Sequence, residues 1–402
     1  MTHRVVITGL GVVSAFGLTT DEFWQGVSNG QCVIKPLSAQ EGIKISVGAR
    51  LPEYDENELF SAEELPLLDR CSQLAILAAE QAVADAGLSG HEDLINAATI
   101  IGSGGGGKHT DEEGYKKLYK DKRTRVHPLS IPKGMHSAVS SCVSKHLGTK
   151  GPVFSVASAC SSGSHAIIQG SMMVQLGLAD IAIVGGSDAP FTYGLLKAWD
   201  AMRVVSKEAC RPFSKNRSGM SLGEGAGVLV LESEEHARQR GAKIYAELAG
   251  YGMSSDAGHI TRPDIDGISK AMKDALNNAK VKPEDVDYVS AHGTGTIAND
   301  LAETRALHNV FGDHAKTLAV SSTKSMHGHA LGASSAIELV STTLAMFHSR
   351  IPPTINLDEK DADCDLDYVA NEPRNQKIDI ALTNSFAFGG LNAVLVIKRY
   401  KT

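Results

Sequence analysis

Short apolar runs alternate with longer amphipathic segments along the whole chain. The apolar runs predict strands over 4–11, 97–104, 153–159, 181–188, 226–233, 245–254, 286–293, 318–323, 380–390 and 392–399. Helical periodicity predicts helices near 21–28 and over 66–86, 161–177, 235–241, 268–280, 299–310 and 331–348. Because the predicted strands are apolar throughout and alternate with helices, the pattern indicates an α/β fold with sheets covered on both faces.

The two halves of this pattern resemble each other. In the first half Cys160 opens a predicted helix, and "GEGAGVLVLE" (223–232) brings a glycine turn and a strand about 65 residues later. In the second half "HGHALGASSAIELV" (327–340) opens a helix, and "FGGLNAVLVIK" (388–398) follows after a similar interval. We therefore predict a duplicated architecture, with one half at 1–248 that carries the cysteine and another at 249–402 that carries two histidines.

Composition narrows the class of protein. The chain has 402 residues, 42% hydrophobic and 21% charged, with a net charge of −7, which is ordinary for a globular enzyme and gives no reason to expect nucleic acid. Its six cysteines are scattered without metal-type spacing, which predicts a reduced, cytoplasmic setting. The start "MTHRVVITGLGVVS" reads as a buried strand and turn, and no apolar stretch approaches the length of a membrane span.

The stretch "VFSVASACSSGSHAIIQG" (153–170) places Cys160 where a strand gives way to a helix. At a helix N-terminus the macrodipole and free N–H groups favour a thiolate, which is both nucleophile and leaving group in acyl transfer. The small neighbours Ala159, Ser161, Ser162 and Gly163 would leave room for a substrate. Taken alone, the same stretch is more often that of a small structural cysteine in a protein core.

Two histidines and a lysine strengthen the catalytic interpretation. "SAHGTGT" puts His292 at the end of a predicted strand, and "SSTKSMHGHALG" puts His329 and Lys324 after another. Active sites of α/β folds collect at the carboxyl ends of strands, whereas a single histidine there is usually structural. Two histidines, a lysine and a cysteine at the start of a helix are difficult to explain by packing alone.

Glycine-rich segments offer further candidates. In "NSFAFGGLN" (384–392), Gly389 and Gly390 permit a tight turn after Phe388, and backbone N–H groups there and at Cys160 could form an oxyanion hole; a plain hairpin is the alternative. "GSGGGG" (102–107) lacks the order of a nucleotide-binding loop. "HGH" (327–329) has no acidic or thiol companion nearby, so we predict no metal.

Taken together, these motifs resemble the β-ketoacyl-acyl carrier protein synthases, of the elongating type II branch. The match extends over the whole chain and includes "SACSSGSHA", "CRPFSKNRSG", "GEGAG", "SAHGTGT", "SSTKSMHGHALGASSAIE" and "NSFAFGG". Within the family, "GGSDAP", "LKAWDAMR" and "DCDLD" are most similar to rhizobial nodulation ketosynthases and polyene-building enzymes. The resemblance implies the thiolase fold, with duplicated βαβαβαββ halves in an α-β-α-β-α arrangement of five layers.

The resemblance also implies an acyltransferase that elongates fatty-acyl, polyketide or polyene chains. Cys160 would accept an acyl group, malonyl-carrier protein would lose CO2, and the enolate would attack to give a 3-oxoacyl-carrier protein. His292 and His329 would bind the malonyl thioester oxygen. The remaining family positions fall on Lys324 with its partner Glu338, on the gating Phe388 with Gly389, and on Asp300 and Glu303 as structural support.

No cofactor is implied, because the substrates ride on the phosphopantetheine of an acyl carrier protein. The family forms dimers, so we expect a homodimer or a heterodimer with a chain-length-factor-like ketosynthase. A coenzyme A-dependent thiolase is the alternative, but "NSFAFGGLN" lacks the second cysteine that such an enzyme uses.

Two departures from the family pattern matter. Ala387 replaces the usual glycine before the gating Phe388, which restricts the gate. The usual basic docking stretch reads "LFSAEELPLLDR" (59–70), where Glu63 and Glu64 would repel an acidic carrier. We therefore expect docking at other cations, and the candidates are Arg70, the run 116–125, and Lys207 with Lys215 and Arg217, unless a partner subunit supplies the surface.

Overall fold

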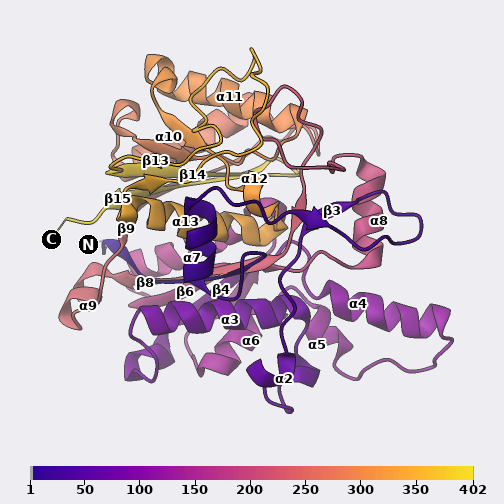
Figure 1. Cartoon of the computed structure of the whole chain (residues 1–402). Helices are drawn as coiled ribbons and strands as arrows, with labels where there is room; N and C mark the ends of the chain where they lie inside the picture. Colours follow the sequence, from indigo (N-terminus) through magenta and orange to yellow (C-terminus); the bar gives the residue numbers. More distant parts are fainter. Residues whose placement is uncertain (1–2, 402) are drawn as a thin grey trace.

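The main sheet of the protein has ten strands in the order β11-β10-β14-β15-β9-β1-β8-β6-β4-β5 (Figure 1). The computed structural model describes residues 3–401. The strands are β1 (Val5–Ser14), β4 (Ala98–Gly102), β5 (Val153–Val156), β6 (Ile181–Asp188), β8 (Gly225–Ser233), β9 (Ala246–Ser255), β10 (Tyr288–Ser290), β11 (Ala319–Ser321), β14 (Ile380–Ala387) and β15 (Leu391–Arg399). All ten correspond to strands predicted from the apolar pattern.

The sheet is built twice from one plan. The first five strands follow the order β1-β8-β6-β4-β5, and the second five follow β9-β15-β14-β10-β11. In each set the first three neighbours pair antiparallel and the last three pair parallel. Only two residue pairs, Val6 with Glu247 and Ile7 with Ala246, join β1 to β9. The predicted duplication is confirmed in the strand order.

Helices divide the molecule into the predicted five layers (Figure 1). α3 (Arg70–Asp85) and α6 (Ala138–Leu147) cover one outer face, and α10 (Ile265–Ala279) and α11 (Ile297–Phe311) cover the other. Between the two sets of strands lie α7 (Ser162–Gln175) and α13 (Ser334–His348). Each half therefore reads βαβαβαββ, which is the thiolase-fold arrangement.

Burial explains why the apolar pattern predicted this sheet so well. β6 and β8 are buried at every position, because helices pack on both of their faces. The central helix α13 is buried from Ser334 to Met346, whereas the outer helix α10 buries only one face. The helix predicted near 21–28 is α1 (Thr20–Ser28), which begins with a capping box between Thr19 and Glu22.

Short or mostly exposed elements were not predicted. Besides α6, the unpredicted helices are α2 (Glu56–Leu59), α4 (Lys108–Tyr115), α5 (Ser130–Gly134), α8 (Tyr193–Met202) and α12 (Lys324–His327). The unpredicted strands are β2 (Lys35–Pro36), β3 (Val47–Ala49), β7 (Leu222–Gly223), β12 (Arg350–Ile351) and β13 (Arg374–Asn375). The remaining predicted helix is α9 (Glu234–Gln239). Across residues 3–401, no helix combines the length and apolarity needed to cross a membrane.

Candidate active site

Cys160 lies in a single 3-10 turn, η4 (Ala159–Ser161), that leads directly into the central helix α7. Ala159 has a left-handed backbone (φ +50°), which turns the chain sharply just before the cysteine. The Cys160 side chain is buried, and its thiol lines a cavity of about 380 Å³. The structure therefore places the predicted nucleophile at a helix N-terminus inside a cavity.

The charge state of Cys160 differs from the expectation. Burial raises the pKa of the thiol to about 12. The Lys324 ammonium and the backbone N–H groups of Cys160 and Phe388 act in the opposite direction, but more weakly. The prediction that the helix N-terminus holds Cys160 as a thiolate is wrong, because desolvation of the buried sulfur outweighs the helix dipole. In this structure Cys160 is therefore a thiol.

His292 and His329 lie side by side in the lining of the same cavity. Their ring centroids lie 5.5 Å apart with the rings nearly perpendicular, at 85°. His292 follows β10, and His329 follows the short helix α12, which comes after β11. Burial, and then the charge of Lys324, hold the pKa of both imidazoles well below the ordinary value of 6.5. Both rings are therefore neutral at physiological pH.

Two buried carboxylates hold the backbone around His292. Glu303 accepts hydrogen bonds from the N–H groups of His292 and Gly293, both at 2.8 Å, and from Asn384 Nδ2 at 3.0 Å. Asp300 accepts from Phe213 N at 2.8 Å and from Gly295 N at 3.2 Å. Both acids are on α11, so this helix fixes the loop that carries the histidine.

Lys324 forms a buried ion pair with Glu338 of α13. Both side chains are almost completely inaccessible to solvent. Burial raises the pKa of Glu338 to about 7, and the charge of Lys324 opposes this rise. The lysine does not line the cavity, so it acts on the histidines and the thiol through its electric field.

The segment 384–392 is a hairpin turn and also a wall of the cavity. β14 pairs with β15, and Phe388 to Gly390 form the turn, in which both glycines have positive φ (84° and 71°). The ring of Phe388 packs against Trp199, with centroids 6.0 Å apart. Gly389 N–H donates to Ile260 O at 2.7 Å. The Gly389 N–H is therefore already occupied and cannot serve as an oxyanion donor, contrary to the expectation. Its predicted part in a gate at Phe388 stays a prediction.

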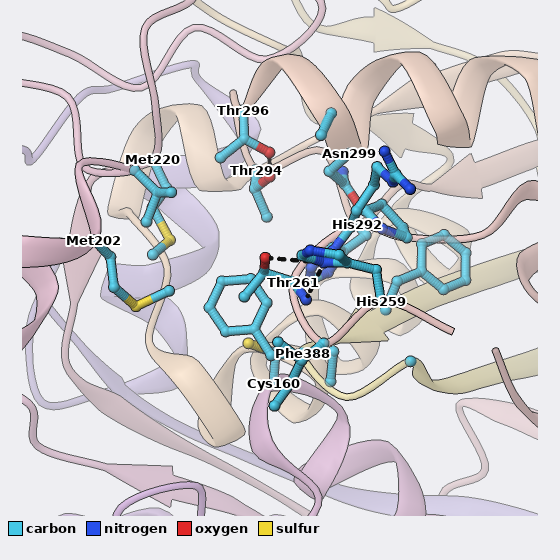
Figure 2. Close-up of a pocket in the computed structure, with 18 of the residues that line it drawn as sticks. Cys160, Met202, Met220, His259, Thr261, His292, Thr294, Thr296, Asn299 and Phe388 are labelled. Carbon is cyan, nitrogen blue, oxygen red and sulfur yellow. Dashed lines mark hydrogen bonds between the residues drawn. The ribbon is translucent and has the colours of Figure 1, made fainter. Parts of the chain in front are cut away.

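The cavity brings together residues from both halves (Figure 2). Cys160 and Phe388 lie at one end, and His292 lies to one side of them. The sequence did not single out several lining residues: Trp199, Met202, Met220, His259, Thr261, Thr294, Thr296 and Asn299. Thr294 and Thr296 lie within the "HGTGT" motif, which could have signalled them, and their hydroxyls are 2.9 Å apart. Trp199 and Met202 lie on the unpredicted helix α8.

The glycine-rich loop after β4 binds a protein carboxylate. Asp188 is buried and accepts hydrogen bonds from Ser103 Oγ (2.8 Å), Gly104 N (2.8 Å), Gly105 N (2.9 Å) and Gly332 N (2.7 Å). These donors are therefore already occupied. Within residues 3–401, no group of three or more His, Cys, Asp or Glu side chains is placed to hold a metal ion.

Two of the predicted docking cations lie inside the protein. Arg70 donates to Glu224 from Nε (3.0 Å) and a terminal nitrogen (2.9 Å), and its side chain is 18% exposed. Arg217 pairs with Asp361 at 2.5 Å, and its side chain is only 4% exposed. Their prediction as docking residues is wrong, because both guanidinium groups are largely covered and already paired, Arg70 with Glu224 and Arg217 with Asp361. Lys207, Lys215 and most of the run 116–125 are exposed.

Comparisons with known proteins cover the whole chain. Family models described as "Beta-ketoacyl synthase, N-terminal domain" and "Beta-ketoacyl synthase, C-terminal domain" match residues 2–237 and 245–358. Nodulation protein E of Rhizobium meliloti is 46% identical over 402 residues, covering 99% of this chain and 100% of that protein. The 3-oxoacyl-[acyl-carrier-protein] synthase 2 of Synechocystis is 40% identical over 411 residues, covering 99% and 98%. The solved ishigamide ketosynthase/chain length factor superposes with a TM-score of 0.95 at 35% identity, covering 100% of both chains.

Proposed function

The chain belongs to the β-ketoacyl synthase family, and from this premise we propose that it is a 3-oxoacyl-[acyl-carrier-protein] synthase. It condenses a carrier-bound acyl thioester with malonyl-carrier protein, and CO2 is released. The observation that carries the proposal is the meeting of one buried thiol and two neutral imidazoles in a single cavity. The thiol supplies a covalent acyl carrier, and neutral imidazoles supply N–H donors for an enolate.

In the first step Cys160 takes the acyl group. Its sulfur bonds to the acyl carbonyl carbon, the carrier thiolate leaves, and the proton of the thiol ends on that carrier thiolate. Because the pKa of Cys160 is about 12, proton loss accompanies bond formation, and a neutral imidazole is available to accept the proton. The backbone N–H groups of Cys160 and Phe388, which favour the charged thiol, are placed to stabilise the transient oxyanion.

In the second step the malonyl thioester loses CO2. The electron pair of the broken bond forms an enolate, whose oxygen accepts hydrogen bonds from His292 and His329. The enolate carbon attacks the acyl-Cys160 thioester, and the new carbon–carbon bond expels the Cys160 thiolate. The thiolate takes up one proton from solvent, because the malonyl group has lost CO2 and not a proton. Neutral rings suit this step, because they donate a hydrogen bond without needing a proton from solvent. Glu303 and Asp300 support the His292 loop in this scheme.

The substrates need no dissociable cofactor in this proposal, since both arrive on the phosphopantetheine arm of a carrier protein. The cavity offers such an arm the hydroxyls of Thr261, Thr294 and Thr296. Met202 and Met220, toward the left in Figure 2, add an apolar part of the lining that suits an acyl chain. Phe388 lies between these regions and Cys160, and Ala387 beside it restricts the movement of this gate.

We propose that the carrier protein docks on a basic depression of about 1030 Å³ beside the cavity. The two hollows share one wall: Trp199 lines both, Met202 and Val204 line the cavity, and Arg203 and Val205 line the depression. Five cations line the depression against two acids: Lys44, Lys197, Arg203, Lys207 and Arg211 against Asp200 and Glu208. Lys44, Arg203 and Lys207 are exposed and have no ion-pair partner among the described residues, so they are available to a carboxylate-rich surface.

A charge-reversal experiment tests the docking surface. Lys44→Glu/Lys207→Glu should raise KM for the acyl-carrier protein about tenfold, with less effect at high salt, and leave KM for an acyl-phosphopantetheine unchanged. The matched control is Lys116→Glu/Lys120→Glu, which makes the same charge change on the other exposed basic run. A KM increase in the control alone would move docking to 116–125.

The activity itself has a direct test. Purified protein is incubated with acyl- and malonyl-carrier protein, and CO2 and 3-oxoacyl product are measured, with and without a candidate chain-length-factor partner. Product from the wild type and none from Cys160→Ala is the expected result. Absence of product from the wild type under both conditions rejects the proposal.

A dimer is supported by the free edge of the sheet. β5 ends the strand order, and its Val153 and Phe154 are 37% and 36% exposed. The partner is a second copy or a chain-length-factor-like ketosynthase, such as the one named with the ishigamide enzyme. The division into halves at 1–248 and 249–402 is likewise our assignment, and it falls within β9. A cytoplasmic location remains a prediction from the free cysteines, six among the described residues.

A further inference from the structure

We infer that Ser334 is a positioning residue that fixes the ring proton of His329 on Nε2. The inference rests on the proposed function and deepens it, because it states which hydrogen-bond donor the malonyl thioester meets. Ser334 is the first residue of the central helix α13 and is buried with His329.

The hydrogen bonds of Ser334 leave one consistent arrangement. Its Oγ is 2.8 Å from the backbone nitrogen of Ala330 and 2.7 Å from Nδ1 of His329. The Ala330 N–H is only a donor, so the serine oxygen accepts from it. Among residues 3–401 the serine hydroxyl has no other acceptor than Nδ1. A buried hydroxyl proton without an acceptor is costly, so Ser334 donates to Nδ1.

This arrangement determines the tautomer of His329. A neutral imidazole carries one proton, and Nδ1 is the acceptor of the serine hydroxyl. The proton therefore resides on Nε2. That nitrogen is buried and has no hydrogen-bond partner in the described part of the chain, and the ring lines the cavity. His329 thus presents a fixed N–H donor to a substrate oxygen.

His292 is held in a different way. Glu303 binds its backbone N–H, whereas its own Nδ1 is buried without a partner within residues 3–401. None of the described residues therefore fixes the ring proton of His292. The two histidines are not equivalent: His329 is a permanent donor, and His292 is free to exchange the ring nitrogen that carries its proton.

Ser162 provides a matched control. It opens α7 as Ser334 opens α13, and its Oγ accepts from Ser158 N at 2.9 Å. Its hydroxyl donates to the carbonyl of Ala159 at 2.6 Å, not to a histidine. Ser162→Ala and Ser334→Ala therefore remove the same backbone acceptor, but only the second removes a donor to an imidazole.

The test reads the tautomer directly. In protein labelled with nitrogen-15 at histidine, we expect His329 to show a protonated Nε2 and a bare Nδ1. Ser334→Ala should mix the two tautomers, and Ser334→Thr should keep the wild-type signals. In a Cys160→Gln background, malonyl decarboxylation should fall about tenfold with Ser334→Ala. Acylation of Cys160, measured in the otherwise native enzyme, should change by less than about twofold.

The outcomes separate this inference from the proposed function. Ser162→Ala should lower the urea midpoint about as much as Ser334→Ala and leave the His329 signals unchanged. A wild-type spectrum with the proton on Nδ1, or an unchanged tautomer in Ser334→Ala, overturns the inference. The wild-type spectrum alone decides it if the alanine variant does not fold. Because the spectrum needs no substrate, failure of the condensation assay would count against the proposed function only.

Discussion

The two halves begin their central helices with the same backbone device but use it differently. A left-handed residue precedes each helix, Ala159 (φ +50°) in the first half and Leu331 (φ +49°) in the second. In each half a serine three residues later, Ser162 or Ser334, accepts the N–H of the residue just before the left-handed one. The position after the left-handed residue is Cys160 in one half and Gly332 in the other. The two halves thus share the backbone conformation at the start of the central helix, but only the first half carries a thiol there.

The residue that lies beside each of these two positions, Asp188 beside Gly332 and Ala387 near Cys160, also differs between the halves. The N–H of Gly332 donates to Asp188, the last residue of β6. The register of β14 places Ala387 at the equivalent position, because Asp188 and Ala387 both pair with the first residue of the next strand. The Asp188 carboxylate therefore occupies the site beside the Gly332 N–H in the second half. The equivalent site in the first half has Ala387 in place of a carboxylate, and it is there that we propose the oxyanion hole beside Cys160.

The largest effect is expected when the thiol is moved between halves. Cys160→Ala should reduce condensation by about four orders of magnitude or more, because no other group forms the acyl intermediate. Adding Gly332→Cys should not restore it, since a Cβ there would lie 2.5 Å from Gly104 N and 2.7 Å from Asp188 Oδ2. The measurement is radiolabelled acyl transfer to protein, with folding checked by circular dichroism. Acylation of the double variant would show that the two positions are interchangeable.

Removing the Asp188 carboxylate from its four hydrogen-bond donors should lower the stability of the protein. Asp188→Ala leaves two glycine N–H groups of the loop, Gly332 N–H and the Ser103 hydroxyl without their acceptor. We expect the free energy of unfolding to fall by about 3–5 kcal/mol in urea titrations. Ala387→Asp is the matched change in the other half, and it should abolish acylation by placing a charge at the proposed oxyanion hole. Equal stability of Asp188→Ala and wild type would contradict this account of the Asp188 site.

The reactive groups of the two halves should also titrate in different pH ranges, Cys160 at high pH and the two histidines at low pH. The pKa of Cys160 is raised to about 12, so its alkylation by iodoacetamide should quicken about tenfold per pH unit between pH 7 and 9. The pKa values of His292 and His329 are lowered, so both rings stay neutral as the pH falls. Malonyl decarboxylation by Cys160→Gln should accordingly stay level from pH 8 to about pH 6. A loss centred near 6.5 would mean that burial does not depress these pKa values.

The sequence predicted those features that depend on buried, regular segments. All ten strands of the main sheet were found, because helices on both faces make them continuously apolar. Cys160, His292 and His329 stood out because each follows a predicted strand near glycines or small residues. These signals lie within short stretches of sequence, so they can be recognised without knowledge of tertiary contacts.

Features that depend on tertiary partners were missed or predicted wrongly. α8 was missed although Leu195, Trp199 and Met202 recur at helical spacing, and its cavity residues Trp199 and Met202 were missed with it. The thiolate at Cys160 was wrong because helix position reveals the dipole but not the depth of burial. Arg70 was wrongly predicted as a docking residue because its partner, Glu224, is 154 positions away in the sequence.

The smallest expected effect concerns the shared turn itself. Ala159→Gly removes the strain of a left-handed alanine at the cost of a more flexible unfolded chain, so we expect a net gain of about 0.5–1 kcal/mol in urea unfolding. Leu331→Gly relieves the same strain, but it also removes a buried side chain that packs with Met220 and Leu222, and should lose about 2–5 kcal/mol. The opposite signs would show that the turn is a common backbone device, with packing added only in the second half. Destabilisation by Ala159→Gly would instead mean that the alanine side chain contributes to the site beyond its backbone conformation.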